Sequence, residues 1–107
     1  MLGRWEGRWI SHTNGHNGAL RCIIKPATNG LSLAHFRATY LKVARFSYTV
    51  PLEVTASDGV WHFRGKEDLG AMAGGVYHYD GSATATNFEA TYTSKYDGGV
   101  FELHRPE

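Results

Sequence analysis

The chain has 107 residues, 42% of them hydrophobic and 20% charged, and its 11 lysine and arginine residues almost balance its 10 acidic residues. This length supports one hydrophobic core, so we expect a single domain over residues 1–107. A net charge of +1 without a run of like charge gives no indication of nucleic acid or an anionic membrane as a partner.

Cys22 is the only cysteine in the chain. A disulfide within the chain is therefore excluded, and a reducing, cytoplasmic location is favoured. The chain does not begin with a basic segment followed by an apolar run, and no apolar stretch approaches the roughly 18 residues that span a membrane. We expect a soluble cytoplasmic protein, with a removed signal peptide as the open alternative.

Turn signals that contain glycine separate runs rich in β-branched and aromatic residues. These signals are Asn14-Gly15, Asn17-Gly18, Asn29-Gly30, Asp58-Gly59, Gly74-Gly75 and Asp97-Gly98-Gly99. They predict strands near 3–12, 18–26, 31–41, 44–56, 60–66, 74–84, 87–95 and 99–105. Asp80-Gly81 is ambiguous, because it can mark either a bulge in the sixth strand or a turn that splits this strand.

Alternation along these strands assigns one apolar and one polar face to each of them, because residues two apart share a side of a sheet. Of the 14 aromatic residues, all but Tyr96 fall on the apolar faces. Short antiparallel strands with one wet face form a sandwich or a barrel, and only the barrel removes exposed edges. The sequence therefore predicts an all-β fold, a closed antiparallel up-and-down β-barrel of about eight strands.

Gly3-Arg4-Trp5 on the first strand and Arg105 at the end of the last strand resemble the G-x-W motif and closing arginine of the calycins, the lipocalin, avidin and fatty-acid-binding superfamily. The resemblance implies a lipocalin-like barrel in which Trp5 plugs one end and Arg105 packs across its ring. A guanidinium over an indole gains cation–π attraction of about 0.5–2 kcal/mol. The implied role of this pair is structural closure.

The run from Trp5 to Gly18, with Tyr77-His78-Tyr79 and the segment from Tyr92 to Phe101, resembles a family of small uncharacterised bacterial proteins, many of them from planctomycetes. This second resemblance implies no activity. The chain lacks the biotin-contacting pattern of avidins and is much shorter than typical lipocalins, so neither biotin nor a large lipid is expected.

Four tyrosines are predicted to converge at the barrel end opposite Trp5 and Arg105. They are Tyr40, Tyr48, Tyr77 and Tyr92, and the loop that carries Asn14 and His16 covers them. Buried hydroxyls need partners, and converging ones can hold a polar group of a ligand against aromatic walls. We expect these six residues to bind a small, flat, partly apolar molecule. The alternative is a solid barrel whose hydroxyls bond to one another, to loop carbonyls or to water.

Little in the sequence supports metal binding or catalysis. His12 and His16 flank a turn, so the helical i, i+4 spacing of metal ligands does not apply. Cys22 lies between Leu20 and Ile24 on an apolar face, where a thiol is usually a small buried hydrophobe. No nucleophile stands beside a base, and no paired carboxylates suggest a cleft. We expect no metal, no cofactor and no enzymatic activity.

The competing prediction is a structural or scaffolding protein that uses its outer surface, for example as a homodimer. It depends on apolar side chains predicted to point outward. These are Ile10, Leu31, Leu33, Val43, Val60 and Val76.

Overall fold

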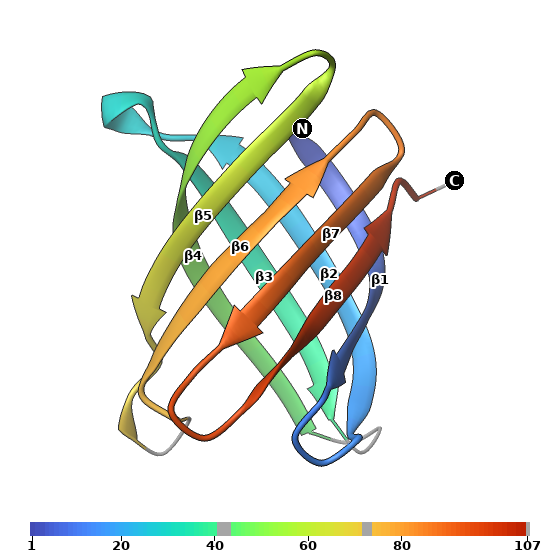
Figure 1. The fold of residues 1–107 in the computed structure, drawn as a ribbon, viewed down its shortest axis with the longest axis vertical. Coiled ribbons are helices and arrows are strands. Elements are labelled where there is room, and N and C mark those ends of the chain that lie inside the picture. The colour runs from blue at the N-terminus through green and yellow to red at the C-terminus, as the bar shows by residue number, and fades with distance from the viewer. Residues whose placement is uncertain (41–43, 72–73, 107) are drawn as a thin grey trace.

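Eight antiparallel strands close into a barrel in the computed structural model, which describes residues 1–40, 44–71 and 74–106 (Figure 1). Each strand pairs with the next along the chain, and β8 pairs with β1 to close the barrel. A 3₁₀ turn, η1 (Thr28–Gly30), lies between the second and third strands. The strands are β1 (Gly3–Ser11), β2 (Asn17–Pro26), β3 (Ser32–Tyr40), β4 (Ala44–Ser57), β5 (Val60–Asp68), β6 (Val76–Ala83), β7 (Asn87–Thr93) and β8 (Gly98–His104).

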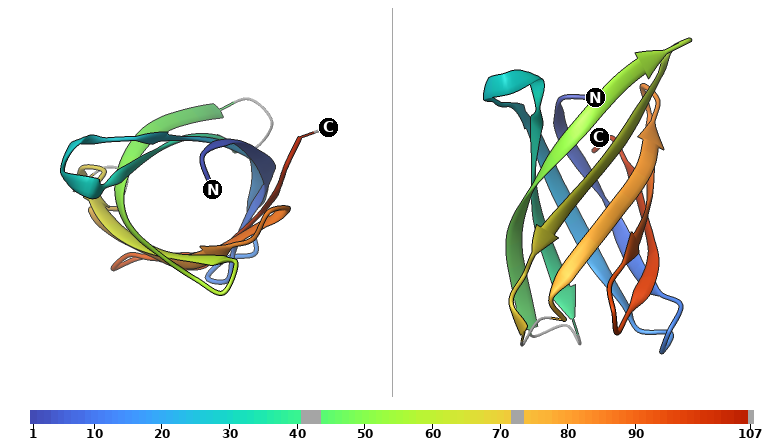
Figure 2. Two further views of the ribbon diagram at one scale, coloured as in Figure 1. Left: turned by 90° about the horizontal axis from the view of Figure 1, so that it is seen from above. Right: turned by 60° about the vertical axis from the view of Figure 1, so that its left-hand side comes forward.

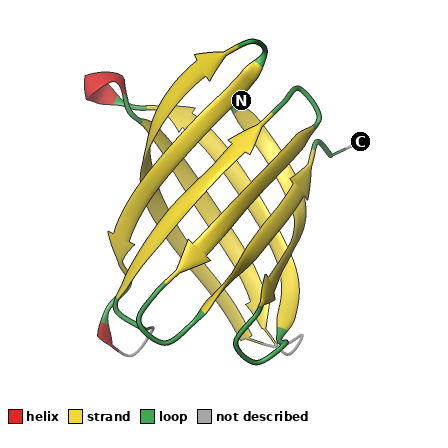
Figure 3. Cartoon of the chain, viewed as in Figure 1, coloured by secondary structure: helices red, strands yellow, loops and turns green. Residues whose placement is uncertain are grey.

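The predicted fold class is confirmed, and each strand begins and ends within two residues of its predicted bounds. Strands make up most of the drawn chain, and the connections between them are short (Figure 3). Asp80-Gly81 does not split the sixth strand, because Gly81 pairs with Phe63 on β5 and with Ala90 on β7 in unbroken register. Gly81 instead makes room inside the barrel, since a Cβ there would lie 2.7 Å from Cζ of Phe63.

The two ends of the barrel differ in what closes them. Both termini and η1 lie at one end, and the β1–β2 and β7–β8 loops lie at the other (Figure 2). Trp5 and Phe88 are completely buried, and their ring centroids are 5.5 Å apart. Phe63 stacks on Phe88 at 4.7 Å. These rings fill the end that holds the termini, which we call the closed end.

One predicted inward residue lies largely in solvent. Phe46 has the inward parity of β4, opposite Ala38 on β3, but its side chain is 51% exposed. It stands two residues from the start of β4, at the rim of the barrel opposite the termini (Figure 1). Tyr96, the aromatic residue predicted to lie outside the core, is 68% exposed.

Among the described residues, no helix has the length and apolar character needed to cross a membrane.

Candidate functional site

A pocket of about 610 Å³ lies at the end opposite the termini, which we call the open end. The structure brings together there all six residues predicted to bind a ligand. They are Tyr40 on β3, Tyr48 on β4, Tyr77 on β6, Tyr92 on β7, and Asn14 and His16 from the β1–β2 loop. The sequence did not assign the other described lining residues to this site: Trp9, Ala38, Arg45, Phe46, Ser47, Leu69, Tyr79, Asp97 and Phe101.

Stacked aromatic rings cross the barrel beneath this pocket. Phe36 on β3 stands at their centre, with its ring centroid 5.3 Å from those of Tyr48 and Phe101 and 6.1 Å from that of Tyr79. Tyr92 continues the layer, since it stacks on Phe101 at 5.1 Å. This aromatic layer, formed by Phe36, Tyr48, Tyr79, Tyr92 and Phe101, separates the pocket from the closed end. It offers flat ring faces and ring edges to whatever enters the pocket.

Hydrogen bonds fix the side chains at the mouth of the pocket. The Tyr40 hydroxyl and Nδ1 of His16 are 2.5 Å apart. The backbone N–H of His16 donates to Oδ1 of Asn14 at 2.9 Å, which holds the β1–β2 turn in shape. Trp9 Nε1 donates to the Thr39 carbonyl at 2.9 Å. These hydrogen bonds hold the described side chains at the mouth in defined positions, which lowers the cost of ordering them when a ligand binds.

A second network joins the β1–β2 loop to the β7–β8 loop. Ser11 is buried, with only 2% of its surface exposed, and its hydroxyl donates to Oδ1 of Asp97 at 2.6 Å. That same carboxylate oxygen accepts the Gly98 N–H at 2.8 Å. In turn, the Thr13 N–H donates to Ser11 Oγ at 3.2 Å. Ser11 and Asp97 were not predicted from the sequence as part of the site, although a serine at a strand end and an aspartate in an Asp-Gly-Gly turn are both typical of such loop contacts.

Three tyrosines of the pocket, Tyr48, Tyr79 and Tyr92, keep their hydroxyl protons well beyond neutral pH, because their pKa values are raised. Burial raises the pKa of Tyr48 and of Tyr79 above the usual range of a phenol. Burial, and then the charge of Asp97, raises the pKa of Tyr92 to about 12. These hydroxyls can therefore donate hydrogen bonds at physiological pH. The Tyr92 hydroxyl oxygen is enclosed and has no hydrogen-bond partner among the described residues.

Trp5 and Arg105 meet at the closed end. The Arg105 guanidinium carbon lies 3.9 Å from the Trp5 ring centroid, and Nη1 donates to the Arg4 carbonyl at 3.0 Å. Trp5 Nε1 donates to the Met1 carbonyl at 2.9 Å. Gly3 has a φ of 101°, and a Cβ on it would lie 3.2 Å from Nη1 of Arg105. The glycine of the Gly3-Arg4-Trp5 motif thus supplies both the backbone conformation and the space that this contact requires.

Histidine, cysteine and acidic side chains do not gather in threes within the described residues, so no metal-binding cluster is present in that part of the chain. His16 is engaged with Tyr40, and His35 with the Thr49 hydroxyl at 2.8 Å on the outer surface. Cys22 is buried, and burial raises the pKa of its thiol to about 12. It therefore carries almost no thiolate at neutral pH.

The outward apolar residues of the competing prediction lie on different strands. Ile10 on β1 pairs with Val100, Leu33 on β3 pairs with Lys25 and Pro51, and Val76 on β6 pairs with Asp68. Leu31 precedes β3, Val60 begins β5, and Val43 lies outside the described residues. Within the described part of the barrel, these positions do not follow one another from strand to strand as a continuous apolar row.

Comparisons with known proteins identify no relative of this chain: no protein-family model, no curated protein and no solved structure matches it.

Proposed function

We propose that this barrel binds a small, flat, partly apolar molecule in its open-end pocket. The observation that carries the proposal is the convergence of Tyr40, Tyr48, Tyr77 and Tyr92 on one pocket of about 610 Å³. Pockets that enclose small ligands commonly measure about 300–1,000 Å³ and combine apolar walls with a few polar groups. The open-end pocket has this size and this composition.

The chemistry of the lining supports a flat ligand with at least one polar atom. The aromatic layer favours a molecule that can stack on its rings or meet their edges. The enclosed Tyr92 hydroxyl has no protein partner among the described residues, and leaving such a group unpaired costs about 1–3 kcal/mol. Because the oxygen is enclosed, a ligand would have to displace the side chains around it to bring a hydrogen-bonding atom to this hydroxyl, and it would then recover that energy.

The titratable groups in and near the pocket favour binding over catalysis. Asp97, a carboxylate in the pocket lining, already accepts hydrogen bonds from Ser11 and Gly98. The phenols of Tyr48 and Tyr79 remain protonated because burial raises their pKa values, and the Cys22 thiol lies buried with a raised pKa. A buried, protonated thiol in a chain without a second cysteine also fits the proposed cytoplasmic location. We keep the calycin-like assignment as a proposal supported by the Gly3, Trp5 and Arg105 contacts at the closed end.

The competing proposal remains a scaffolding protein that assembles through its outer surface. Native mass spectrometry of protein purified from its own host, set against the denatured mass of the same sample, tests both. A mass excess on the monomer that disappears on denaturation is the expected result. A bare mass at dimer or higher stoichiometry would contradict pocket binding and favour assembly.

A matched pair of variants makes the test specific to the pocket. Ala38 on β3 lines the pocket, whereas Ala19 on β2 is exposed on the outside of the barrel. Ala38→Phe should remove the bound mass by filling the site, and Ala19→Phe should retain it. If a bound mass persisted in Ala38→Phe, with the fold verified by circular dichroism, the ligand would lie elsewhere. Tyr48→Phe, which keeps the ring and removes only the hydroxyl, provides a second, gentler variant.

A further inference from the structure

Charge is segregated around the barrel, although it nearly cancels over the whole chain. Residues 1–52 hold seven arginine or lysine residues and one acidic residue, Glu6. Residues 53–107 hold four arginine or lysine residues and nine acidic residues. Because consecutive strands are neighbours, the two halves of the sequence form two opposite sides of the molecule. Figure 1 views the acidic side, with β5, β6 and β7 in front and β2 and β3 behind.

The outer surface of β1–β4 is called the basic wall here. Its described cationic side chains are all exposed. They are Arg4, Arg8, Arg21, Lys25, Arg37 and Arg45. Five of the six are arginines, whose planar guanidinium groups bind phosphate oxygens in pairs, in a geometry that lysine cannot reproduce.

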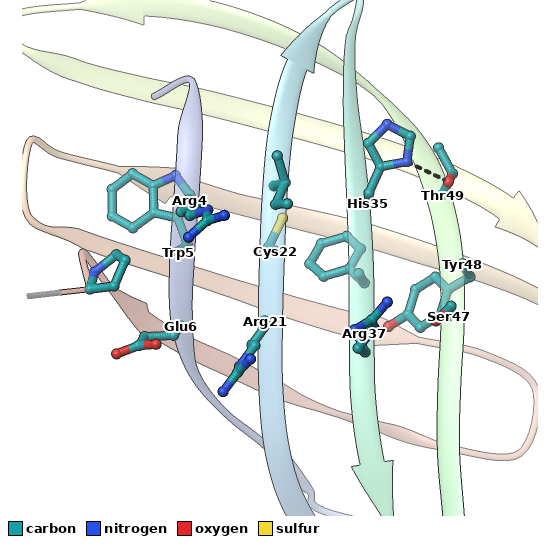
Figure 4. A pocket seen from close by; sticks show the side chains of 13 residues that line it. Arg4, Trp5, Glu6, Arg21, Cys22, His35, Arg37, Ser47, Tyr48 and Thr49 are labelled. Carbon is teal, nitrogen blue, oxygen red and sulfur yellow. Dashed lines mark hydrogen bonds between the residues drawn. The ribbon is translucent and has the colours of Figure 1, made fainter.

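Three of these arginines stand on adjacent strands around one hollow of about 570 Å³ (Figure 4). Arg4 lies on β1, Arg21 on β2 and Arg37 on β3. Arg21 and Arg37 are directly opposite each other in the β2–β3 register, where Cα atoms are about 4.5–5.5 Å apart. Like charges in this position destabilise a sheet. An anion shared by the two guanidinium groups would turn this repulsion into attraction.

Among the described residues, no acidic side chain forms an ion pair with the arginines of this hollow. The ion pairs among the described residues join Arg8 to Glu102 and Arg64 to Glu53. Neither involves Arg4, Arg21 or Arg37. Glu6 lines the hollow and lies opposite Arg21 in the register, yet it forms no salt bridge with a described residue. One carboxylate beside three arginines leaves the hollow with an excess of positive charge.

Proteins bind the phosphodiester backbone of nucleic acids through such surfaces. The interfaces are more positively charged and more polar than protein–protein interfaces, and they need no apolar centre. Trp5, Cys22, Phe36 and Tyr48 also line the hollow, but the first three are buried and Tyr48 is half-buried. Ile23, at 39% exposure, is therefore the one large apolar lining residue that is exposed among those described, and the hollow fits this description. Hydroxyl groups from Ser47 and Thr49 complete its outer edge.

A second copy of this chain, docked by its acidic side, is the rival occupant. A stable protein–protein interface usually has an apolar or aromatic centre, and Ile23 alone does not provide one. A contact between two different sides of the same molecule is also heterologous, so it propagates into filaments unless the rotation happens to close a ring. Both considerations favour a separate polyanion over a second copy.

We propose that the basic wall binds the phosphodiester backbone of a nucleic acid without reading its sequence, with Arg4, Arg21 and Arg37 as the phosphate contacts. This inference is independent of the open-end pocket. It replaces the sequence-based expectation of no nucleic-acid partner, which depended on the net charge and on the absence of a charge run. The strand pairing assembles the positive surface from residues that are far apart in the sequence.

The test is fluorescence anisotropy of a labelled 20-nucleotide oligothymidine, and of a 20-base-pair duplex, titrated with the full chain. For about three phosphate contacts, the affinity should fall about 20- to 40-fold between 50 and 200 mM NaCl. The triple variant Arg4→Gln/Arg21→Gln/Arg37→Gln should weaken binding and lower the salt slope by about two for the oligothymidine and by nearly three for the duplex. Circular dichroism verifies that this variant is folded.

A matched control separates the basic wall from net charge. Arg64→Gln/Lys66→Gln/Lys95→Gln removes the same number of positive charges from β5 and the β7–β8 loop, and it should bind like the wild type. Equal losses in the two triple variants would overturn the assignment to the basic wall. Absence of any wild-type binding at 50 mM NaCl would overturn the proposal altogether. Ala38→Phe should bind the oligonucleotide normally, so failure of the pocket proposal is distinguishable.

Two further outcomes identify the rival occupants. Thymidine monophosphate is the other source of the same chemistry. If thymidine monophosphate displaced the oligonucleotide at equal phosphate concentration, the ligand would be a free phosphate ester, and the proposal of a nucleic-acid polymer would be overturned. A wild-type oligomer that was dissociated both by the arginine triple variant and by Asp80→Asn/Glu89→Gln would identify a second copy as the occupant and overturn the proposal.

Discussion

Arg105, two residues before Glu107, covers the ring of Trp5 on the first strand, with 3.9 Å between the guanidinium carbon and the ring centroid. The contact joins the last strand to the first across the point where the barrel closes. It combines attraction between cation and ring with a hydrogen bond to the Arg4 carbonyl. One residue thus satisfies a carbonyl group and seals the barrel end.

Arg105→Ala should lower the free energy of unfolding by about 2 kcal/mol, since it removes both the cation–π contact and a hydrogen bond from a charged donor. Urea unfolding followed by tryptophan fluorescence measures this change. Arg37→Ala is the control, because an exposed arginine outside such contacts should change stability by no more than about 0.5 kcal/mol. Equal effects of the two substitutions would show that the closing contact contributes nothing specific.

Gly81→Ala should destabilise the barrel by about 1–3 kcal/mol, in the range of overpacked cores. Its Cβ would lie 2.2 Å from the Glu89 carbonyl oxygen and 2.7 Å from Cζ of Phe63, so the backbone of β7 has to shift. Gly98→Ala is the matched control, because its nearest contact, the Tyr92 carbonyl oxygen, would be at an ordinary 3.5 Å. Thermal unfolding of both variants compares them, and a Gly81→Ala midpoint equal to that of Gly98→Ala would refute the packing argument.

The sequence predicted the barrel because its two strongest signals, turn glycines and alternating apolar residues, are local. Tyr48 and Tyr92 could be placed in one pocket by following the meander from Trp5. Asp97 could not, since its contact with Ser11 depends on the conformations of two loops. The segregated charge was present in the sequence as a difference between two halves, and only the strand order shows that the halves form opposite sides.

Ser11→Ala should lower the free energy of unfolding by about 1–3 kcal/mol. The substitution leaves Asp97 without its 2.6 Å hydroxyl donor and the Thr13 N–H without its acceptor in a part-buried site, and unpaired groups there carry that cost. Hydrogen exchange of the Thr13 and Gly98 amides should speed up as the two loops separate. Ser47→Ala, on the exposed outer face, serves as the control. Unchanged exchange in Ser11→Ala would mean that backbone contacts alone hold the loops together.

Stability should fall as the pH rises above about 9. Burial raises the pKa of Cys22 from 9.0 to about 12, and it raises those of Tyr48 and Tyr79 above the usual phenol range. The unfolded chain therefore releases these protons at a lower pH than the folded chain does. The stabilising contribution is complete below the unfolded pKa values and is lost as the pH climbs towards the folded ones.

Each fully buried group should lower the free energy of unfolding by about 1.4 kcal/mol per pH unit within its window, which opens near pH 9 for Cys22 and near pH 10 for the tyrosines. Urea unfolding at pH 8, 9, 10 and 11 measures the slope. Tyr79→Phe should flatten it between pH 10 and 11, because the phenylalanine has no proton to lose. If the slope for Tyr79→Phe were as steep as that for the wild type, the Tyr79 phenol would have the same pKa in the folded and the unfolded chain. Water would then reach it in the folded barrel, and the aromatic layer would not seal the pocket from below.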